Sequence, residues 1–207
     1  MKKIWSIASV LSGNLVRTRG HGAGGAVYLT FDDGPHPQHT ARLLDLLAKF
    51  DAKASFFMVG KTVEKAPHLV QRMLAEGHTI GNHSMTHPKM RSIGAAAQQR
   101  EIEQADAVLE RLDGQRRHLY RPPNGAVTWP MMTHSLRHRQ PLVLWSIDSL
   151  DYKLPAEQVV TRLTTTAPPK PGDVILFHDD GGSAGVALQT LLPLWKQAGL
   201  TFAAVHR

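Results

Sequence analysis

The chain contains no cysteine among its 207 residues, which excludes disulfide bridges, thiolate metal sites and catalysis by a thiol. A domain of this length buries roughly 70% of the surface that its unfolded chain exposes, so it needs no covalent cross-links. A transition-metal site, if there is one, must therefore use imidazole and carboxylate ligands. The 12 histidines provide an ample supply of imidazoles.

Long apolar runs are also missing, since no stretch approaches the 18 or more apolar residues typical of a membrane-spanning helix. Lys2 and Lys3 precede an apolar-leaning segment, as in a signal peptide. That segment, residues 4–11, is short, contains two serines and lacks a small-residue cleavage site. We therefore favour a cytoplasmic or membrane-associated protein over an exported one.

Acidic residues are scarce only at the start of the chain. The whole chain has 24 Lys+Arg against 17 Asp+Glu, and residues 1–25 hold four of the basic residues and no acidic one. A basic arm can contact an anionic surface, whereas the nearly balanced remainder does not indicate a nucleic-acid partner. We expect a basic N-terminal arm over residues 1–25, the only part suited to membrane contact. We also expect one catalytic domain over residues 26–207, acting as a monomer.

Strand-like and helix-like segments alternate from residue 26 onward. Short apolar runs are followed by segments whose apolar residues recur at helical spacing. This alternation predicts parallel β-α-β units, in either an open doubly wound sheet or a closed barrel. We expect Trp129 and Trp145 in the core, with a place in the groove wall as the alternative for either. The expected strands are residues 26–30, 54–59, 79–82, 119–121, 142–147, 174–177 and 202–205, and the expected helices are residues 40–50, 62–76, 95–112, 129–138, 155–167 and 186–198.

Ionisable residues gather where five of these strands end. In parallel α/β folds, ligands and catalytic groups lie at the carboxyl ends of the strands. We therefore expect these residues to converge on one rim. The segments are TFDDGP (30–35), NHSMTHP (82–88), RPPNG (121–125), DSLDY (148–152) and HDD (178–180).

His83 and His87 are four positions apart, so a single helical turn would point both imidazoles the same way. With the neighbouring pair Asp32 and Asp33, they supply two imidazoles and one carboxylate for a metal, and a second carboxylate beside it. Such ligands suit zinc, and iron, cobalt or nickel can use the same set. A metal with three protein ligands can activate a water and polarise a carbonyl, which predicts hydrolysis.

Other ionisable residues complete a hydrolytic site. A carboxylate beside the metal can take the proton of the water, and His178, from another strand end, can protonate a leaving amine. Arg121 can pair with the base carboxylate and lower its pKa, and Asp151 or Asp148 can keep His178 protonated.

The five segments resemble, in order and spacing, the motifs of the polysaccharide deacetylase family (NodB-homology domain, carbohydrate esterase family 4), over about residues 26–205. The resemblance implies a single-domain α/β fold, a distorted (β/α)7 barrel with its active site at the C-terminal ends of the strands. It also implies one divalent metal ion, zinc, with Co2+, Ni2+ or Fe2+ as alternatives. The implied metal ligands are Asp33, His83 and His87, and the implied catalytic residues are Asp32 (base), His178 (acid), Arg121 (orients Asp32) and Asp151 (tunes His178).

The resemblance also implies a set of substrate-binding residues. Leu176 is the expected wall of the pocket for the acetyl methyl group, and the backbone N–H of Asn124 is the expected donor to the oxyanion. Pro123 and Tyr152 belong to the same set. Asn124 stands where the family usually has tyrosine, and Tyr152 stands where it has tryptophan. A backbone donor survives a side-chain change, so we expect catalysis to persist while the groove wall changes.

We therefore expect a metal-dependent hydrolase that removes N-acetyl groups from N-acetylglucosamine-type units of a glycan and releases acetate. The acetylated substrate would be a chitooligosaccharide, peptidoglycan or an exopolysaccharide. Alternatives are a hydrolase of a small amide or cyclic imide on the same fold, and a non-catalytic glycan-binding relative. An iron oxygenase with two histidines and one carboxylate is a third alternative, but it leaves Asp32 and His178 without a role.

Overall fold

Strands and helices alternate along residues 15–20 and 22–206, the part of the chain that this computed structural model describes. The strands are β1 (Val16–Arg17), β2 (Ala26–Asp32), β3 (Ala54–Met58), β4 (Thr79–Asn82), β5 (Leu119–Tyr120), β6 (Leu142–Val143), β7 (Ile147–Asp148), β8 (Val174–His178) and β9 (Thr201–Phe202). The α-helices are α2 (His39–Lys49), α3 (Gly60–Lys65), α4 (Pro67–Ala75), α5 (Ala95–Asp113), α6 (Trp129–His138), α7 (Ala156–Thr161) and α8 (Ser183–Gln197). Short helical turns are η1 (Ala23–Gly25), η2 (Met90–Ser92), η3 (Pro123–Gly125) and η4 (Arg162–Thr166).

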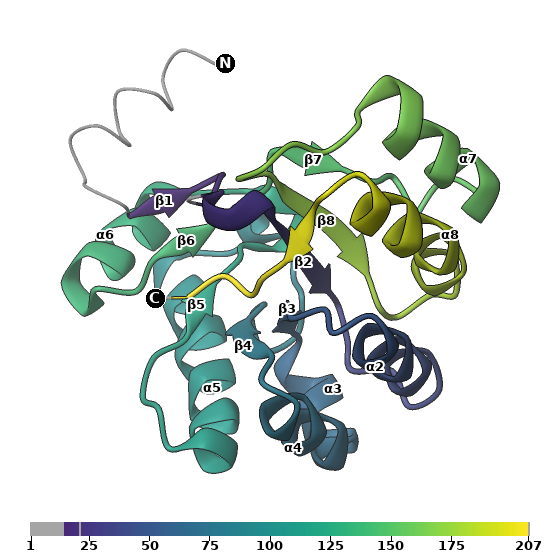
Figure 1. Cartoon of the computed structure of the whole chain (residues 1–207). Helices are drawn as coiled ribbons and strands as arrows, with labels where there is room; N and C mark the ends of the chain where they lie inside the picture. Colours follow the sequence, from purple (N-terminus) through teal and green to yellow (C-terminus); the bar gives the residue numbers. More distant parts are fainter. Residues whose placement is uncertain (1–14, 21, 207) are drawn as a thin grey trace.

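The strands form one curled sheet with the helices around its outside (Figure 1). The strand order is β1-β6-β5-β4-β3-β2-β8-β7, with β9 paired to β2, and these neighbours are parallel. The sheet is the distorted (β/α)7 barrel that was predicted, and because its strands are parallel, their carboxyl ends meet at one rim.

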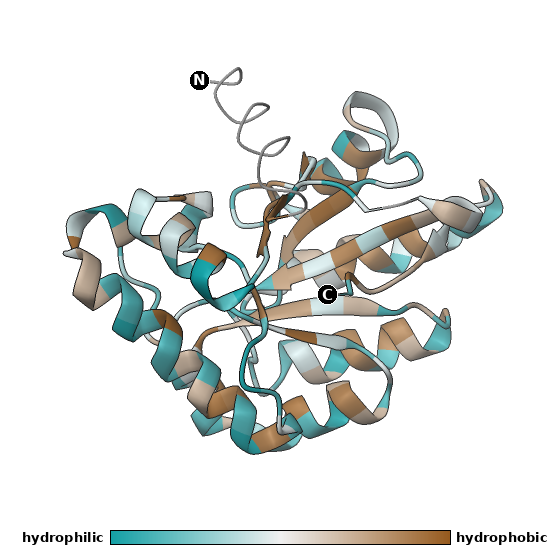
Figure 2. Cartoon of the chain, turned by 90° about the vertical axis from the view of Figure 1, so that its left-hand side faces the viewer, coloured by the Kyte–Doolittle hydropathy of each residue, from teal (hydrophilic) through white to brown (hydrophobic). Residues whose placement is uncertain are grey.

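The core lies between the central strands and the helices that cover them. Phe31 of β2 stacks on Phe56 of β3 and on Phe177 of β8, with ring centroids 5.2 Å and 5.7 Å apart. Leu44 and Leu47 of α2 are fully buried in the same cluster. Hydrophobic residues accordingly concentrate along the strands, whereas the helices carry many hydrophilic ones (Figure 2). This packing makes the central strands a rigid base for the loops at their ends.

The helix predicted over residues 62–76 is two helices. α3 ends at Lys65 and α4 begins at Pro67, and Ala66 between them has a non-helical backbone. Proline lacks an N–H donor and disfavours helical conformation at the residue before it. A single continuous helix was therefore the wrong prediction here.

The strand predicted over residues 142–147 is also divided. β6 pairs with β5 and β1 at one end of the strand order, whereas β7 pairs with β8 at the other end. The N–H of Leu144 donates to the carbonyl of Arg17 (2.7 Å), and that of Ser146 donates to the carbonyl of Val174 (2.9 Å). Residues 142–148 therefore bridge the two ends of the strand order, and this bridge is where the sheet departs from a regular closed barrel.

The sheet extends upstream of residue 26, into the predicted arm. β1 pairs with β6, and Arg19 forms an ion pair of 2.9 Å with Asp173, just before β8. Leu15, which precedes β1, is only 7% exposed. Residues 1–14 of the predicted arm lie outside the described residues. Within the described part of the chain, none of the helices combines the length and apolar character needed to cross a bilayer.

Candidate active site

The carboxyl ends of the strands surround a pocket of about 320 Å³. The ends of β2, β4, β7 and β8 and the loops that follow β5, β6 and β7 supply its walls. Most of the lining residues belong to the segments that were expected at the rim from the sequence. The lining residues are Asp32, Asp33, His83, His87, Asn124, Trp145, Asp148, Tyr152, Leu176, His178 and Asp180.

Asp33, His83 and His87 form a compact cluster of possible metal ligands. The Oδ1 atom of Asp33 lies 3.5 Å from Nε2 of His83 and 3.3 Å from Nε2 of His87. Ligands about 2.1 Å from a tetrahedral zinc are separated by roughly 3.4 Å, so the spacing fits such an ion. The same Oδ1 is buried without a hydrogen-bond partner in the described chain. The cluster therefore fits a divalent metal, although these donors alone do not select one.

His83 is oriented for metal binding by its second nitrogen. Its Nδ1 lies 2.7 Å from the carbonyl oxygen of Arg121, so Nδ1 carries the proton. The lone pair of Nε2 is then free for a metal ion shared with Asp33. Burial lowers the pKa of His83 to about 3, although the charge of Asp33 acts in the opposite direction. The imidazole is therefore neutral, which is the form that binds metals. A carbonyl on the other ring nitrogen is the usual way to fix such a ligand.

The two histidines do not share a helical turn, so that part of the prediction was wrong. Residues 83–87 form a tight non-helical loop in which Ser84 (φ 70°) and His87 (φ 54°) have left-handed backbones. The side-chain oxygen of Asn82 accepts from the N–H of Ser84 (2.8 Å), and the hydroxyl of Ser84 accepts from the N–H of His87 (3.0 Å). Asn82 also donates to the carbonyl of Ile102 in α5 (2.8 Å). These bonds, rather than helical periodicity, bring the two rings together.

Asp32 is buried at the end of β2 and pairs with the fully buried Arg121. Nη1 of Arg121 donates to Oδ1 of Asp32 at 2.7 Å. Burial raises the pKa of Asp32 above its ordinary value, and the charges of Arg121 and His178 oppose this rise without cancelling it. Arg121 thus pairs with Asp32 and lowers its pKa as expected, but desolvation of the carboxylate is the larger effect, so the net shift is upward.

The guanidinium of Arg121 is fixed on several sides. It donates to the hydroxyl of Thr30 (2.9 Å) and to the carbonyls of Val143 (3.1 Å) and Leu144 (3.2 Å). Its Cζ lies 4.1 Å from the centroid of the Phe57 ring. Arg121 is thus placed to orient Asp32. Thr30 was not predicted as a site residue, because its contribution is a contact between distant strands.

His178, on β8, is held by Asp151 from the loop after β7. Its Nδ1 lies 2.9 Å from Oδ1 of Asp151, and its backbone N–H donates to Oδ2 (2.8 Å). Burial lowers the pKa of His178, but the hydrogen bond to Asp151 and its charge outweigh this effect and raise the pKa to about 9. Asp148 instead accepts from the N–H of Leu150 (2.9 Å). Of the two candidate carboxylates, Asp151 is therefore the one that keeps His178 protonated.

The predicted substrate-binding residues are only partly in the pocket wall. Leu176, Tyr152 and Asn124 line the pocket, whereas Pro123 is buried beside it and is not a lining residue. The Tyr152 ring stands edge-on to the His178 ring, with centroids 5.2 Å apart. Asn124 has a left-handed backbone (φ 55°) in η3. The pocket thus has an aromatic side and an apolar wall beside the ionisable groups.

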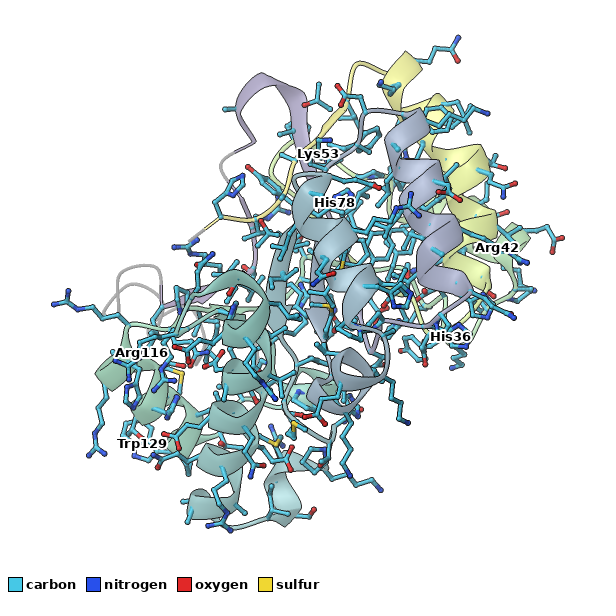
Figure 3. The ribbon with its side chains drawn as sticks, turned by 90° about the horizontal axis from the view of Figure 1, so that it is seen from below. His36, Arg42, Lys53, His78, Arg116 and Trp129 are labelled. Atoms are coloured by element: carbon cyan, nitrogen blue, oxygen red, sulfur yellow. The ribbon has the colours of Figure 1, made fainter. Side chains whose placement is uncertain are left out.

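The two tryptophans expected in the core lie elsewhere. Trp145 lines the pocket, and Trp129 is 78% exposed at the periphery of the molecule (Figure 3). Asp180 is a further lining residue; it belongs to the HDD segment expected at the rim, but no role was predicted for it. Trp145 was missed because the strand was expected to continue through it. Trp145 lies in the loop between β6 and β7, at the rim of the sheet, and its side chain therefore reaches the pocket.

The family model for polysaccharide deacetylases matches residues 19–139, which is more than half of the chain. The chain belongs to the polysaccharide deacetylase family. It is 33% identical over 180 residues to a peptidoglycan-N-acetylglucosamine deacetylase of Bacillus cereus, an alignment that covers 85% of this chain and 65% of that protein. It is 35% identical over 156 residues to a chitooligosaccharide deacetylase of Sinorhizobium fredii, covering 74% of this chain and 72% of the relative.

A solved structure of the polysaccharide deacetylase fold matches nearly the whole described domain. The crystal structure of the Bc1960 peptidoglycan N-acetylglucosamine deacetylase superposes with a TM-score of 0.87 at 30% identity, covering 95% of this chain and 94% of that one. The resemblance inferred from the motifs is therefore confirmed at the level of family and fold. The roles of individual residues stay predictions, supported by the geometry described above.

Proposed function

We propose that this chain removes N-acetyl groups from N-acetylglucosamine-type units of a glycan by metal-dependent hydrolysis, releasing acetate. One observation carries the proposal: a buried carboxylate, Asp32, lies beside an Asp-His-His cluster and faces the same pocket as the protonated His178. The names of the relatives, peptidoglycan-N-acetylglucosamine deacetylase and chitooligosaccharide deacetylase, support this class of substrate.

The cofactor that suits the cluster best is zinc, because neutral imidazole and carboxylate are its usual nitrogen and oxygen ligands, and Co2+, Ni2+ and Fe2+ share them. Bound by Asp33, His83 and His87, such an ion supplies polarisation of the acetyl carbonyl and a lowered pKa for an attacking water.

The chain's own residues move the protons. One oxygen of Asp32 is held by Arg121, and the other, Oδ2, lies 3.7 Å from Nε2 of His83, beside the metal cluster. Asp32 takes a proton from the water while the oxygen of the water bonds to the carbonyl carbon of the acetyl group. His178, whose Nδ1 is held by Asp151, gives its Nε2 proton to the amine nitrogen as the C–N bond breaks. The products are acetate and the free amine of the glycan.

The remaining pocket residues fit an N-acetylated sugar. Leu176 lines the pocket and is only 3% exposed, so it offers a small apolar patch against which the acetyl methyl group can pack. Tyr152 and Trp145 offer aromatic faces on which a sugar ring can rest. Asn124 lines the same pocket, and we assign to its backbone N–H the hydrogen bond that stabilises the oxyanion. The substrate class follows from these walls together with the family.

Replacing Asp32 with Asn should abolish most turnover while leaving the metal bound. We expect acetate release to fall by roughly 10²–10⁴-fold, the contribution typical of a general base. The assay uses untagged protein loaded with Zn2+ or Co2+ and a panel of acetylated chitooligosaccharides, peptidoglycan and xylan. Metal content is measured on the same samples.

The matched control is Asp51→Asn, since the Asp51 side chain is 90% exposed and its left-handed backbone (φ 49°) suits asparagine. Activity should be unchanged in this control. Loss of the metal together with activity in Asp32→Asn would show that Asp32 is a ligand rather than the base. No acetate from any substrate with the metal-loaded native chain would overturn the proposed function, in favour of a small amide substrate or a binding protein.

A further inference from the structure

A second cluster of metal-binding side chains lies between α5 and α6. Glu103 of α5 and His134 and His138 of α6 each offer a ligand atom, and these atoms all lie within 4.8 Å of one another. The two histidines are four positions apart on one helix, so they share a face, and their ring centroids are 4.3 Å apart. None of the three lines the active-site pocket.

The buried nitrogen of His134 is the observation that points to a ligand. His134 is only 6% exposed, and its Nε2 has no hydrogen-bond partner within the described chain. A buried polar atom without a partner destabilises the fold, so each one in a native structure calls for an explanation such as a bound ion. A metal ion held jointly with His138 and Glu103 would give the His134 imidazole a partner at one of its ring nitrogens.

The surroundings of the cluster suit an ion as well. Oε1 of Glu103 accepts a hydrogen bond from the side-chain amide of Gln99 (2.9 Å), which orients the carboxylate from outside as is usual at metal sites. Gln99, His134 and His138 also line a surface pocket of about 270 Å³. This pocket gives an ion a path from solvent to the cluster. Glu103 and His138 are half-buried, so their side chains can rotate to close around it.

The donor set limits the kind of ion. Two imidazoles and one carboxylate favour zinc and neighbouring divalent transition metals, whereas Ca2+ and Mg2+ prefer oxygen ligands. A pair of histidines at positions i and i+4 of a helix is a common zinc-binding arrangement. Ligands of a tetrahedral zinc are roughly 3.4 Å apart, a separation compatible with three ligand atoms that lie within 4.8 Å of one another.

We propose that Glu103, His134 and His138 form a second site for a divalent transition metal, which cross-links α5 to α6. The site would be structural, because both helices support the catalytic loops. Two residues before Glu103, the Glu101 side chain accepts hydrogen bonds from the N–H and the hydroxyl of Thr86 in the 83–87 loop (both 2.8 Å). The cross-link would add to the bond between Thr128, at the start of α6, and Gln98 of α5 (2.6 Å).

The test counts metal ions in untagged, full-length protein stripped with a chelator and then dialysed against Zn2+. The native chain should bind two equivalents. His138→Ala and Glu103→Gln should each bind one, as should the active-site variant His83→Ala, and the combined His83→Ala/His138→Ala protein should bind none. His68→Ala, which removes an exposed histidine of α4, should still bind two. Zinc should also raise the Tm of the native chain by more than that of His138→Ala.

Two results would overturn the second site. One is a single equivalent in the native chain that is lost in His83→Ala. The other is two equivalents that persist in both His138→Ala and Glu103→Gln, which would place the second ion elsewhere. Acetate release separates this proposal from the proposed function, because it should be lost in His83→Ala and kept in His138→Ala.

Discussion

The protonated form of His178 is stabilised by a neighbouring carboxylate and not by exposure to water. Burial alone would lower its pKa, whereas the hydrogen bond and charge of Asp151 raise it to about 9. Ser149 in turn donates to Oδ1 of Asp151 (2.8 Å) and fixes that carboxylate. A histidine with a raised pKa stays protonated through neutral pH and serves as an acid.

Replacing Asp151 with Asn should therefore move the alkaline limb of the pH–rate profile. Because His178 must be protonated to act as the acid, activity falls as the pH rises through its pKa. Without the Asp151 charge this pKa drops, so we expect the alkaline limb of kcat to shift to lower pH by roughly 1–3 units. Asp148→Asn is the control and should leave the limb in place. Equal shifts in both variants would argue against a specific Asp151–His178 pair.

The ionisable residues of the site could be predicted from the sequence, including the supporting residues Arg121 and Asp151, whereas the uncharged polar residues that support them could not. Asp32, His83 and His178 stand out because each is an ionisable group at the end of a strand. Thr30 and Asn82 hold Arg121 and the 83–87 loop through contacts across the fold. Polar residues of this kind also occur in ordinary turns, so only the spatial arrangement identifies them.

At the scale of elements, the loops at the rim share left-handed backbones at residues other than glycine. Such conformations cost about 1–3 kcal/mol each and persist only where the surroundings impose them. They occur at Asp33 (φ 75°), Ser84 (φ 70°), His87 (φ 54°), Asn124 (φ 55°) and Leu150 (φ 62°). The hydrogen bonds of these loops therefore maintain the geometry of the site against backbone preference.

Replacing Asn82 with Ala should weaken metal binding at Asp33, His83 and His87 without unfolding the protein. The change removes the acceptor for the N–H of Ser84 and the anchor to Ile102. We expect the Kd for Co2+ or Zn2+ at this site to rise about 10–100-fold, as for other residues that support ligands. Calorimetric titration measures the Kd. Ser92→Ala, which removes a hydroxyl that donates to the carbonyl of Lys89 in a local turn (2.7 Å), is the control, and an equal loss in both would contradict the role of Asn82.

Element boundaries were harder to predict than the existence of the elements. The apolar spacing in residues 62–76 continues through Pro67, so periodicity alone indicates one helix where there are two. The strand over 142–147 has a continuous apolar pattern, but its two ends pair with different neighbours. Pairing depends on where other strands lie, which the local pattern does not contain.

At the scale of the whole molecule, a strand from the start of the chain completes the barrel. The carbonyl of Leu15 accepts from the N–H of Leu142 (2.7 Å), and the N–H of Gly20 donates to the carbonyl of Gly172 (2.8 Å). The N-terminal segment thus connects β6 to the turn before β8. The charge pattern had suggested only a basic arm there, because a strand as short as β1 has no detectable periodicity.

Deleting residues 1–20 should destabilise the fold more than deleting residues 1–14. The longer deletion removes β1, the ion pair of Arg19 with Asp173 and the buried side chain of Leu15. Burial of a leucine is worth about 1.5–3 kcal/mol, so we expect at least that loss in the free energy of unfolding. Urea denaturation of the two truncated proteins measures it. Equal stability would show that the barrel is complete from residue 21 onward.

The course of residues 142–148 between β6 and β7 limits which walls of the pocket can change in evolution. Trp145 lies within this segment, and its ring is 5.7 Å from the Cζ atom of Arg121. The same ring leaves no room for a side chain at Gly125, because a Cβ atom there would lie 2.8 Å from it. Tyr152, by contrast, is 61% exposed. One aromatic wall of the pocket is thus tied to the closure of the barrel, and the other is free to vary. A change of substrate preference during evolution would therefore begin with substitutions at and around Tyr152.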